Sequence, residues 1–260
     1  MKGFVDAIKF LDQEKNVSGS TRLARRTRFV IAHISRPLPV LSLSLSLLPR
    51  SSHPSPLPAR AVTADCGYFF NLQAEARKHT KKPVFMSSLC AAPSVAAAYA
   101  PDELIAIFTA NKAKLEPMRD LIKEACGIDP EDKRFIIVDC RYVEDFGDAV
   151  DKGDKVDTVK ATPNIVKLAE KTLQENPKLR AIIMECTELP PYSDAVRAAT
   201  GLPVFDSITT SNAFMASMQD NPLFGANDWQ EKWDGKQDSY HFGDNLTAEQ
   251  KAKITWQTKK

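Results

Sequence analysis

Two cysteines, at positions 66 and 186, end apolar runs of the same form. The runs are Arg60-Ala-Val-Thr-Ala-Asp-Cys66 and Arg180-Ala-Ile-Ile-Met-Glu-Cys186, and each has an acidic residue directly before the sulfur. A cysteine between the end of a strand and the start of a helix can act as an acid or a base, because backbone N–H groups and the helix dipole favour its thiolate. For one such cysteine alone, a buried structural role is the simpler interpretation.

A second match at the same spacing indicates an internal duplication. Pro83-Val-Phe-Met-Ser87 and Pro203-Val-Phe-Asp-Ser207 are 120 residues apart, as are the two cysteines. Two copies of a strand–cysteine–helix unit can present two thiols to one cleft. Opposed thiols suit a reaction that removes a proton from one face of a carbon and returns it to the other, which is racemisation or epimerisation. The simpler alternative is that a duplicated fold inherited two core cysteines.

Strands and helices alternate through the part of the chain that carries these cysteines, which predicts an α/β fold with parallel sheets covered on both faces. The expected strands cover residues 61–66, 83–88, 104–109, 135–139, 181–184 and 203–205. The expected helices cover residues 91–99, 115–126, 162–176, 193–200 and 211–219.

Composition narrows the class of protein. The 260 residues are 43% hydrophobic and 26% charged, as in soluble globular proteins. Five cysteines without a CxxC spacing indicate reduced thiols in a cytoplasmic setting, and four scattered histidines argue against a metal site. The net charge is +2, but seven arginines lie between residues 18 and 60. Without these arginines, the rest of the chain has a net charge of 2 − 7 = −5. This value excludes a basic surface for binding nucleic acid.

The segment 18–58 differs from the rest of the chain. It holds six of the seventeen prolines and a Leu-Ser alternation over residues 41–48. Its apolar part, residues 38–48, is about half the length of a membrane span, so we expect no membrane helix. Its composition predicts disorder, and we interpret it as an insertion foreign to the fold, such as translated intron sequence. Residues 1–15 before it have the spacing of an amphipathic helix.

Three motifs carry a family resemblance. Cys66-Gly-Tyr-Phe, Glu185-Cys-Thr-Glu-Leu-Pro-Pro-Tyr192 and Thr200-Gly-Leu-Pro-Val-Phe-Asp206 resemble the aspartate/glutamate/hydantoin racemase superfamily, and the second motif is typical of its aspartate-racemase-like members. The resemblance implies two pseudo-symmetric Rossmann- or flavodoxin-like lobes with the active site between them. It also implies an enzyme that uses neither pyridoxal phosphate nor another cofactor.

The resemblance also assigns residues. It makes Cys66 and Cys186 the two bases of an amino-acid, α-chiral acid or hydantoin racemase. It places Thr187 and the backbone after each cysteine on the substrate carboxylate, and Thr109 as a further polar ligand. Many members carry Asn-Thr after the first cysteine, at positions that contact the substrate. Here the pair is Gly67-Tyr68, which implies a different or bulkier substrate.

The repeat also suggests where the lobes divide. We expect a first lobe of residues 1–100 plus 208–260 and a second of 101–207, with the family's first strand missing from this chain. The tail carries Trp229, Trp233, Tyr240 and Trp256 and is expected to be a packing surface or a homodimer surface. The expected partner is a small molecule with a carboxylate or carbonyl next to a chiral carbon, and neither a membrane nor a nucleic acid.

Three other interpretations stay open at this point. A maleate isomerase of the same superfamily keeps both cysteines, whereas arylmalonate decarboxylases keep only the one corresponding to Cys186. A non-catalytic binding protein built on a damaged racemase fold would explain the foreign segment and the missing strand. A thiol redox protein is disfavoured, because Cys66 and Cys186 lack the local pairing of such motifs.

Overall fold

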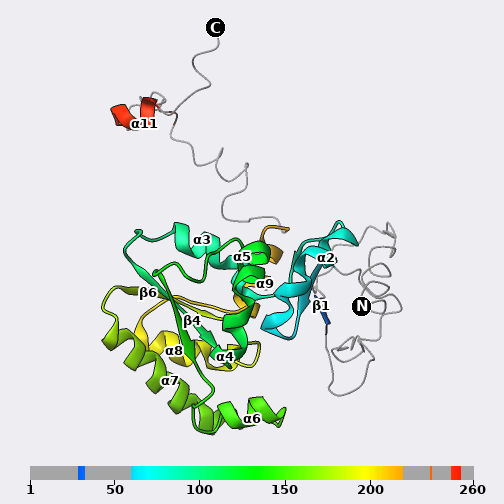
Figure 1. The fold of residues 1–260 in the computed structure, drawn as a ribbon, viewed down its shortest axis with the longest axis vertical. Coiled ribbons are helices and arrows are strands. Elements are labelled where there is room, and N and C mark those ends of the chain that lie inside the picture. Colours follow the sequence, from blue (N-terminus) through cyan, green and yellow to red (C-terminus); the bar gives the residue numbers. More distant parts are fainter. Residues whose placement is uncertain (1–28, 33–59, 219–234, 236–246, 253–260) are drawn as a thin grey trace. The chain divides into compact units, whose positions relative to one another are not determined.

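The computed structural model describes residues 29–32, 60–218, 235 and 247–252 (Figure 1). The chain divides into two compact units, Met1–Met218 and Gln219–Lys260. In the second unit the structure describes the helix α11 (Ala248–Ala252). The helix expected over residues 1–15 and the aromatic residues of the tail lie outside the described residues. Among the described helices, none is long and apolar enough to cross a lipid bilayer.

Two sheets form the framework of the first unit. The strand order of the first is β1 (Phe29–Ala32), β2 (Ala61–Ala64), β3 (Val84–Phe85). The order of the second is β5 (Phe135–Asp139), β4 (Leu104–Thr109), β6 (Leu179–Met184), β7 (Val204–Phe205). Every pairing between these strands is parallel. The prediction of an α/β fold with parallel sheets is therefore confirmed.

The duplication seen in the sequence recurs in the register of the strands. Val62 of β2 pairs with Val84 of β3. Ile182 of β6 pairs with Val204 of β7, each 120 residues further along the chain. The two copies therefore place their cysteine turns at equivalent points of two sheets.

Helices cover both faces of the second sheet (Figure 1). On one face α7 (Thr158–Glu175) and α8 (Ser193–Thr200) pack against Ala106 and Phe108 of β4. On the other, α3 (Ala92–Ala97) and α5 (Arg119–Cys126) pack against Ile105 and Ile107. Successive residues of β4 thus enter different cores, as the alternation of side chains along a strand requires.

Strand β1 corrects one expectation. It lies inside the segment 18–58, for which composition predicts no regular structure, and it pairs with β2 from Phe29↔Ala61 to Ala32↔Ala64. It takes the place beside β2 that β4 takes beside β6. The first sheet therefore has a strand before β2, because four apolar residues suffice for a short strand even within a segment rich in Pro and Ser. The lobe boundaries at residues 100, 101, 207 and 208 remain predictions, and the rest of the segment lies outside the described residues.

Short elements complete the first unit. They are η1 (Gly67–Leu72), α2 (Gln73–Lys78), η2 (Ser88–Ala91), α4 (Lys112–Leu115), η3 (Glu116–Met118), α6 (Gly147–Lys152), η4 (Pro190–Tyr192) and α9 (Ser207–Ala216).

Two helices begin before their expected positions, and capping residues explain both. The side chain of Asp157 accepts a hydrogen bond from the N–H of Lys160 at the start of α7. Asp206 and Thr209 form a reciprocal capping box at the start of α9. The expected starts at residues 162 and 211 overlooked these aspartates.

Helix α9 packs against the first sheet, although it follows the last strand of the second. The rings of Phe85 and Phe214 are stacked, with centroids 4.7 Å apart. Arg60 also donates a hydrogen bond to the carbonyl of Met218 at 3.0 Å. These contacts hold the C-terminal end of the first unit on the sheet that carries Cys66.

We expect Phe214→Ala to lower the free energy of unfolding by about 1–2 kcal/mol, since it removes a ring that is 41% exposed but stacked on the buried Phe85. Ile208→Ala on the same helix is the control, because Ile208 is 57% exposed. Its effect should stay within about 0.5 kcal/mol. Chemical denaturation measures both, and equal effects would show that the ring contact does not hold α9.

Candidate active site

The turns after β2 and β6 lie against each other. Cys66 occupies the N-cap position of η1, and Cys186 follows the last residue of β6 by two positions. Both cysteine residues are half-buried. The hydroxyl of Thr187 donates a hydrogen bond to the carbonyl oxygen of Asp65 and so ties one turn to the other. Because Asp65 adjoins Cys66 and Thr187 adjoins Cys186, this contact brings the turns of the two predicted bases together.

Cys186 lies in surroundings that disfavour its thiolate. Burial raises its pKa well above the ordinary value, and the charge of Glu185 raises it further. The backbone N–H of Glu188 donates to its sulfur at 3.5 Å and acts in the opposite direction. Near neutral pH the thiolate is therefore a minority species, but a strong base once it forms.

The three hydroxyl groups predicted to bind substrate all donate hydrogen bonds to other groups of the protein. Tyr68 donates to the carbonyl of Asn111 at 3.0 Å, and Thr109 donates to Oε2 of Glu185 at 2.9 Å. Thr187 donates to Asp65, as described above. Thr109 is fully buried, and burial raises the pKa of Tyr68 far above its usual value. Tyr68 and Thr187 thus connect the two sheets, whereas Thr109 connects β4 to the end of β6 within the second sheet. Contact of these side chains with substrate remains a prediction.

Gly67 lies where no side chain would fit. A Cβ atom on it would lie 2.1 Å from both the carbonyl oxygen and Oε1 of Glu185. Glycine at this position therefore allows the two turns to approach each other. Whether Gly67 also contacts substrate stays a prediction.

Glu185 also lies where the two turns meet, although the sequence analysis did not predict it as a site residue. Its side chain is buried, and burial raises its pKa from 4.5 to about 7, while the hydrogen bond from Thr109 lowers it. Among the described residues, its Oε1 has no hydrogen-bond partner. The sequence did carry a signal, since an acidic residue precedes the cysteine in both copies of the repeat. Asp65 in the first copy is only half-buried.

The other three cysteines are not part of these turns. The thiols of Cys90 and Cys126 share a hydrogen bond, which lowers the pKa of Cys90 and raises that of Cys126. Cys140 is fully buried, and this burial raises its pKa. All five cysteines are free thiols.

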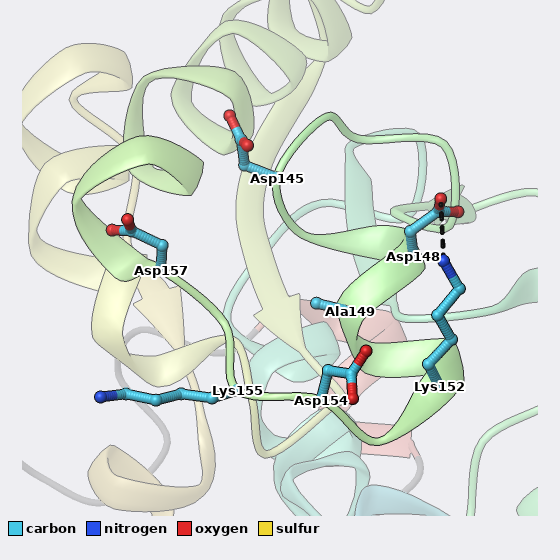
Figure 2. A pocket seen from close by; sticks show the side chains of 7 residues that line it. All are labelled: Asp145, Asp148, Ala149, Lys152, Asp154, Lys155 and Asp157. Atoms are coloured by element: carbon cyan, nitrogen blue, oxygen red, sulfur yellow. Dashed lines mark ion pairs between the residues drawn. The ribbon is translucent and has the colours of Figure 1, made fainter.

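A surface hollow of about 440 Å³ lies between α6 and the start of α7 (Figure 2). Four aspartates and two lysines line it together with an alanine, and Lys152 forms an ion pair with Asp148 at 3.7 Å. Its lining includes none of the predicted site residues. The hollow is thus a solvated patch of mixed charge, separate in its lining from the cysteine turns.

Comparison with known families decides the membership of the chain. The family described as Asp/Glu/Hydantoin racemase matches residues 59–212. The chain belongs to this family. The match includes both cysteine turns and all the residues described around them.

Two curated relatives narrow the chemistry. One, named dimethylsulfoniopropionate lyase 7, from Emiliania huxleyi, is 57% identical over 197 residues, which cover 74% of this chain and 58% of the relative. Another, named dimethylsulfoniopropionate lyase, from Durusdinium sp. clade D, is 48% identical and covers 73% of this chain and 63% of the relative. The chain thus spans less than two thirds of the length of each.

Among solved structures, an allantoin racemase from Pseudomonas fluorescens is similar with a TM-score of 0.40 and 19% identity, over 63% of each chain.

The expected reaction is corrected by the curated relatives. The two cysteines and the family resemblance predict racemisation, but relatives 57% and 48% identical to this chain are named lyases. The isomerase class is therefore wrong, although the family is right. The physical reason is that a thiol base next to a substrate carboxylate explains how a proton is removed, but not what the resulting carbanion does next.

We expect Gly67→Ala to destabilise the fold by about 3 kcal/mol, because the added methyl group meets backbone as well as side chain of Glu185. Gly153→Ala is the control: this glycine has φ +74°, and a methyl group added to it would meet no atom within 4 Å. It should cost about 1 kcal/mol from backbone strain alone. Similar losses in urea denaturation would mean that the turns tolerate a side chain at position 67.

Glu185 should make stability depend on pH. With its pKa raised from 4.5 to about 7 in the folded state, its contribution is full below about pH 4.5 and is lost as the pH rises to about 7. Relative to Glu185→Gln, the native protein should lose about 3 kcal/mol across that range. Denaturation of both proteins at several pH values measures the difference, and a constant difference would contradict the burial of an ionisable carboxyl group.

Proposed function

We propose that this chain carries the catalytic fold of a dimethylsulfoniopropionate lyase. The observation that carries the proposal is the 57% and 48% identity to proteins named for that activity. The pair of thiols at adjoining strand ends supports it, since this elimination starts with removal of a proton next to a carboxylate.

The reaction needs one base. In dimethylsulfoniopropionate, a carboxylate is joined through two methylene groups to a dimethylsulfonium cation. A thiolate takes a proton from the carbon next to the carboxylate, and the electrons of that C–H bond form a carbon–carbon double bond. The bond from the neighbouring carbon to sulfur breaks, and its electron pair leaves with the sulfur. The products are acrylate and neutral dimethyl sulfide, and the base becomes a thiol.

We assign the base to Cys186. Its raised pKa makes its thiolate the stronger base, and the N–H of Glu188 supports the anion. Because a charge on Cys66 raises the pKa of Cys186, two thiolates side by side are disfavoured, and the reactive state of the pair has one thiolate beside one neutral thiol. A one-base elimination is compatible with that state, and the neutral leaving group needs no proton from Cys66.

Tyr68 suits the cationic end of this substrate. Its hydroxyl is held by the carbonyl of Asn111, so the half-buried ring is fixed in place. Both cysteines lie close enough to affect its pKa. An aromatic face attracts a cation, and the ring follows Gly67 where many family members carry Asn-Thr. The proposed substrate has the carboxylate expected from the sequence but no chiral carbon.

The proposal extends to the setting of the protein. The substrate is a small molecule, and five free thiols fit a reducing, cytoplasmic compartment.

Purified protein is incubated with dimethylsulfoniopropionate, and dimethyl sulfide is measured in the headspace by gas chromatography. The native chain should release it, and Cys186→Ala should lower the rate by at least about 100-fold, the usual range for loss of a general base. Cys90→Ala is the control, because Cys90 lies outside the two turns, and it should keep most of the rate.

Repeating the assay in D2O separates the possible outcomes. Deuterium in recovered substrate without dimethyl sulfide would mean that the thiol removes the proton but elimination does not follow. If folded native protein shows neither release nor exchange, the lyase proposal fails for this chain. If Cys186→Ala stays active while Cys66→Ala does not, the base is Cys66.

A further inference from the structure

The buried carboxyl group of Glu185 stands at the junction of the two cysteine turns. It follows the last residue of β6 and directly precedes Cys186 in the chain. Its Oε2 accepts the hydroxyl of Thr109, while its Oε1 and its backbone carbonyl fill the space beside Gly67. The side chain of Glu185, itself next to Cys186 in the chain, thus touches both the turn of Cys66 and the end of β4.

Within the part of the chain that the structure describes, no cation compensates a charge on this group. Burial and the hydrogen bond from Thr109 are the two contributions to its pKa there. The titratable groups that its charge affects are Tyr68 of η1, Cys126 of α5, Cys140 after β5, and Cys186. Each of them is neutral when protonated and becomes an anion on titration, so each opposes the carboxylate.

We propose that Glu185 is a positioning residue whose neutral carboxyl group holds the two cysteine turns together and whose ionisation suppresses the reactivity of the Cys186 thiol. The proposal deepens the proposed function, because it concerns the base assigned there, but it can be tested without the lyase reaction. In this proposal Oε1 of Glu185, which lies beside Gly67, carries the proton of the neutral carboxyl group.

The coupling follows from the sign of the charges. A carboxylate beside Cys186 disfavours a second negative charge, so the thiolate forms more readily while Glu185 keeps its proton. Loss of the Glu185 proton near neutral pH then moves formation of the Cys186 thiolate to higher pH. Two groups that are adjacent in the chain would in this way titrate as one unit.

The test measures alkylation of Cys186 by iodoacetamide between about pH 6 and pH 10, since only the thiolate reacts. Peptide mass spectrometry resolves Cys186 from the other four cysteines. In Glu185→Gln the neutral amide replaces the ionisable group at similar size. Its Cys186 should react roughly tenfold faster than in the native protein at slightly alkaline pH, with the midpoint of the profile at lower pH.

Glu188→Gln is the matched control. Glu188 lies two residues beyond Cys186, is exposed, and its charge contributes less to the pKa of Cys186 than that of Glu185 does. The same charge change there should alter the alkylation rate by less than about threefold. An equal effect of the two variants would mean that net charge, rather than the buried position of Glu185, sets the reactivity.

Thr109→Val provides a second variant that keeps the carboxyl group. The hydrogen bond from Thr109 lowers the pKa of Glu185, so its loss should keep Glu185 protonated to higher pH. Cys186 should then react faster near neutral pH, and Thr109→Ser should restore the native rate. This pair decides the question if Glu185→Gln fails to fold.

An unchanged Cys186 profile in folded Glu185→Gln overturns the proposal, as does a slower reaction in Thr109→Val. Absence of dimethyl sulfide release by the native chain would contradict the proposed function alone, because alkylation requires no substrate.

Discussion

The approach of two turns, one after β2 and one after β6, is the constraint on which the site depends. Parallel strands deliver both turns to the same ends of their sheets, and the absence of a side chain at Gly67 lets the backbone of one turn meet Glu185 of the other. Thr187 adds a hydrogen bond across the junction. Cys66 and Cys186 follow strands of separate sheets, and without this contact their turns would lie apart.

The sequence predicted the parts of this arrangement that repeat. The 120-residue spacing of the cysteines and of the Pro-Val-Phe motifs reflects the shared register of β2 with β3 and of β6 with β7. Apolar runs that end at a cysteine located both turns. Strand β1 was missed because the surrounding prolines and serines outweighed four apolar residues in the composition of its segment.

The chemistry was harder to predict than the fold, for two reasons. A thiol placed to remove a proton does not define whether the proton returns or a neighbouring group leaves, so residue types at Cys66 and Cys186 cannot separate a racemase from a lyase. The role of Glu185 depends on burial, which follows from the meeting of two distant turns and not from local pattern. Asp65 stands at the equivalent place in the first copy and is only half-buried.

The space shared by Gly67 and Glu185 also limits how this site can diversify. Both the backbone and the side chain at position 185 occupy the place of a side chain at position 67, so shortening Glu185 would not by itself open room there. As long as the end of β6 keeps its position, a larger residue at position 67 cannot be accommodated. A new substrate preference therefore cannot arise from a substitution there. Tyr68, whose hydroxyl reaches past this junction to Asn111, meets no such steric limit, so under the proposed function a change of substrate preference would arise at position 68 rather than at position 67.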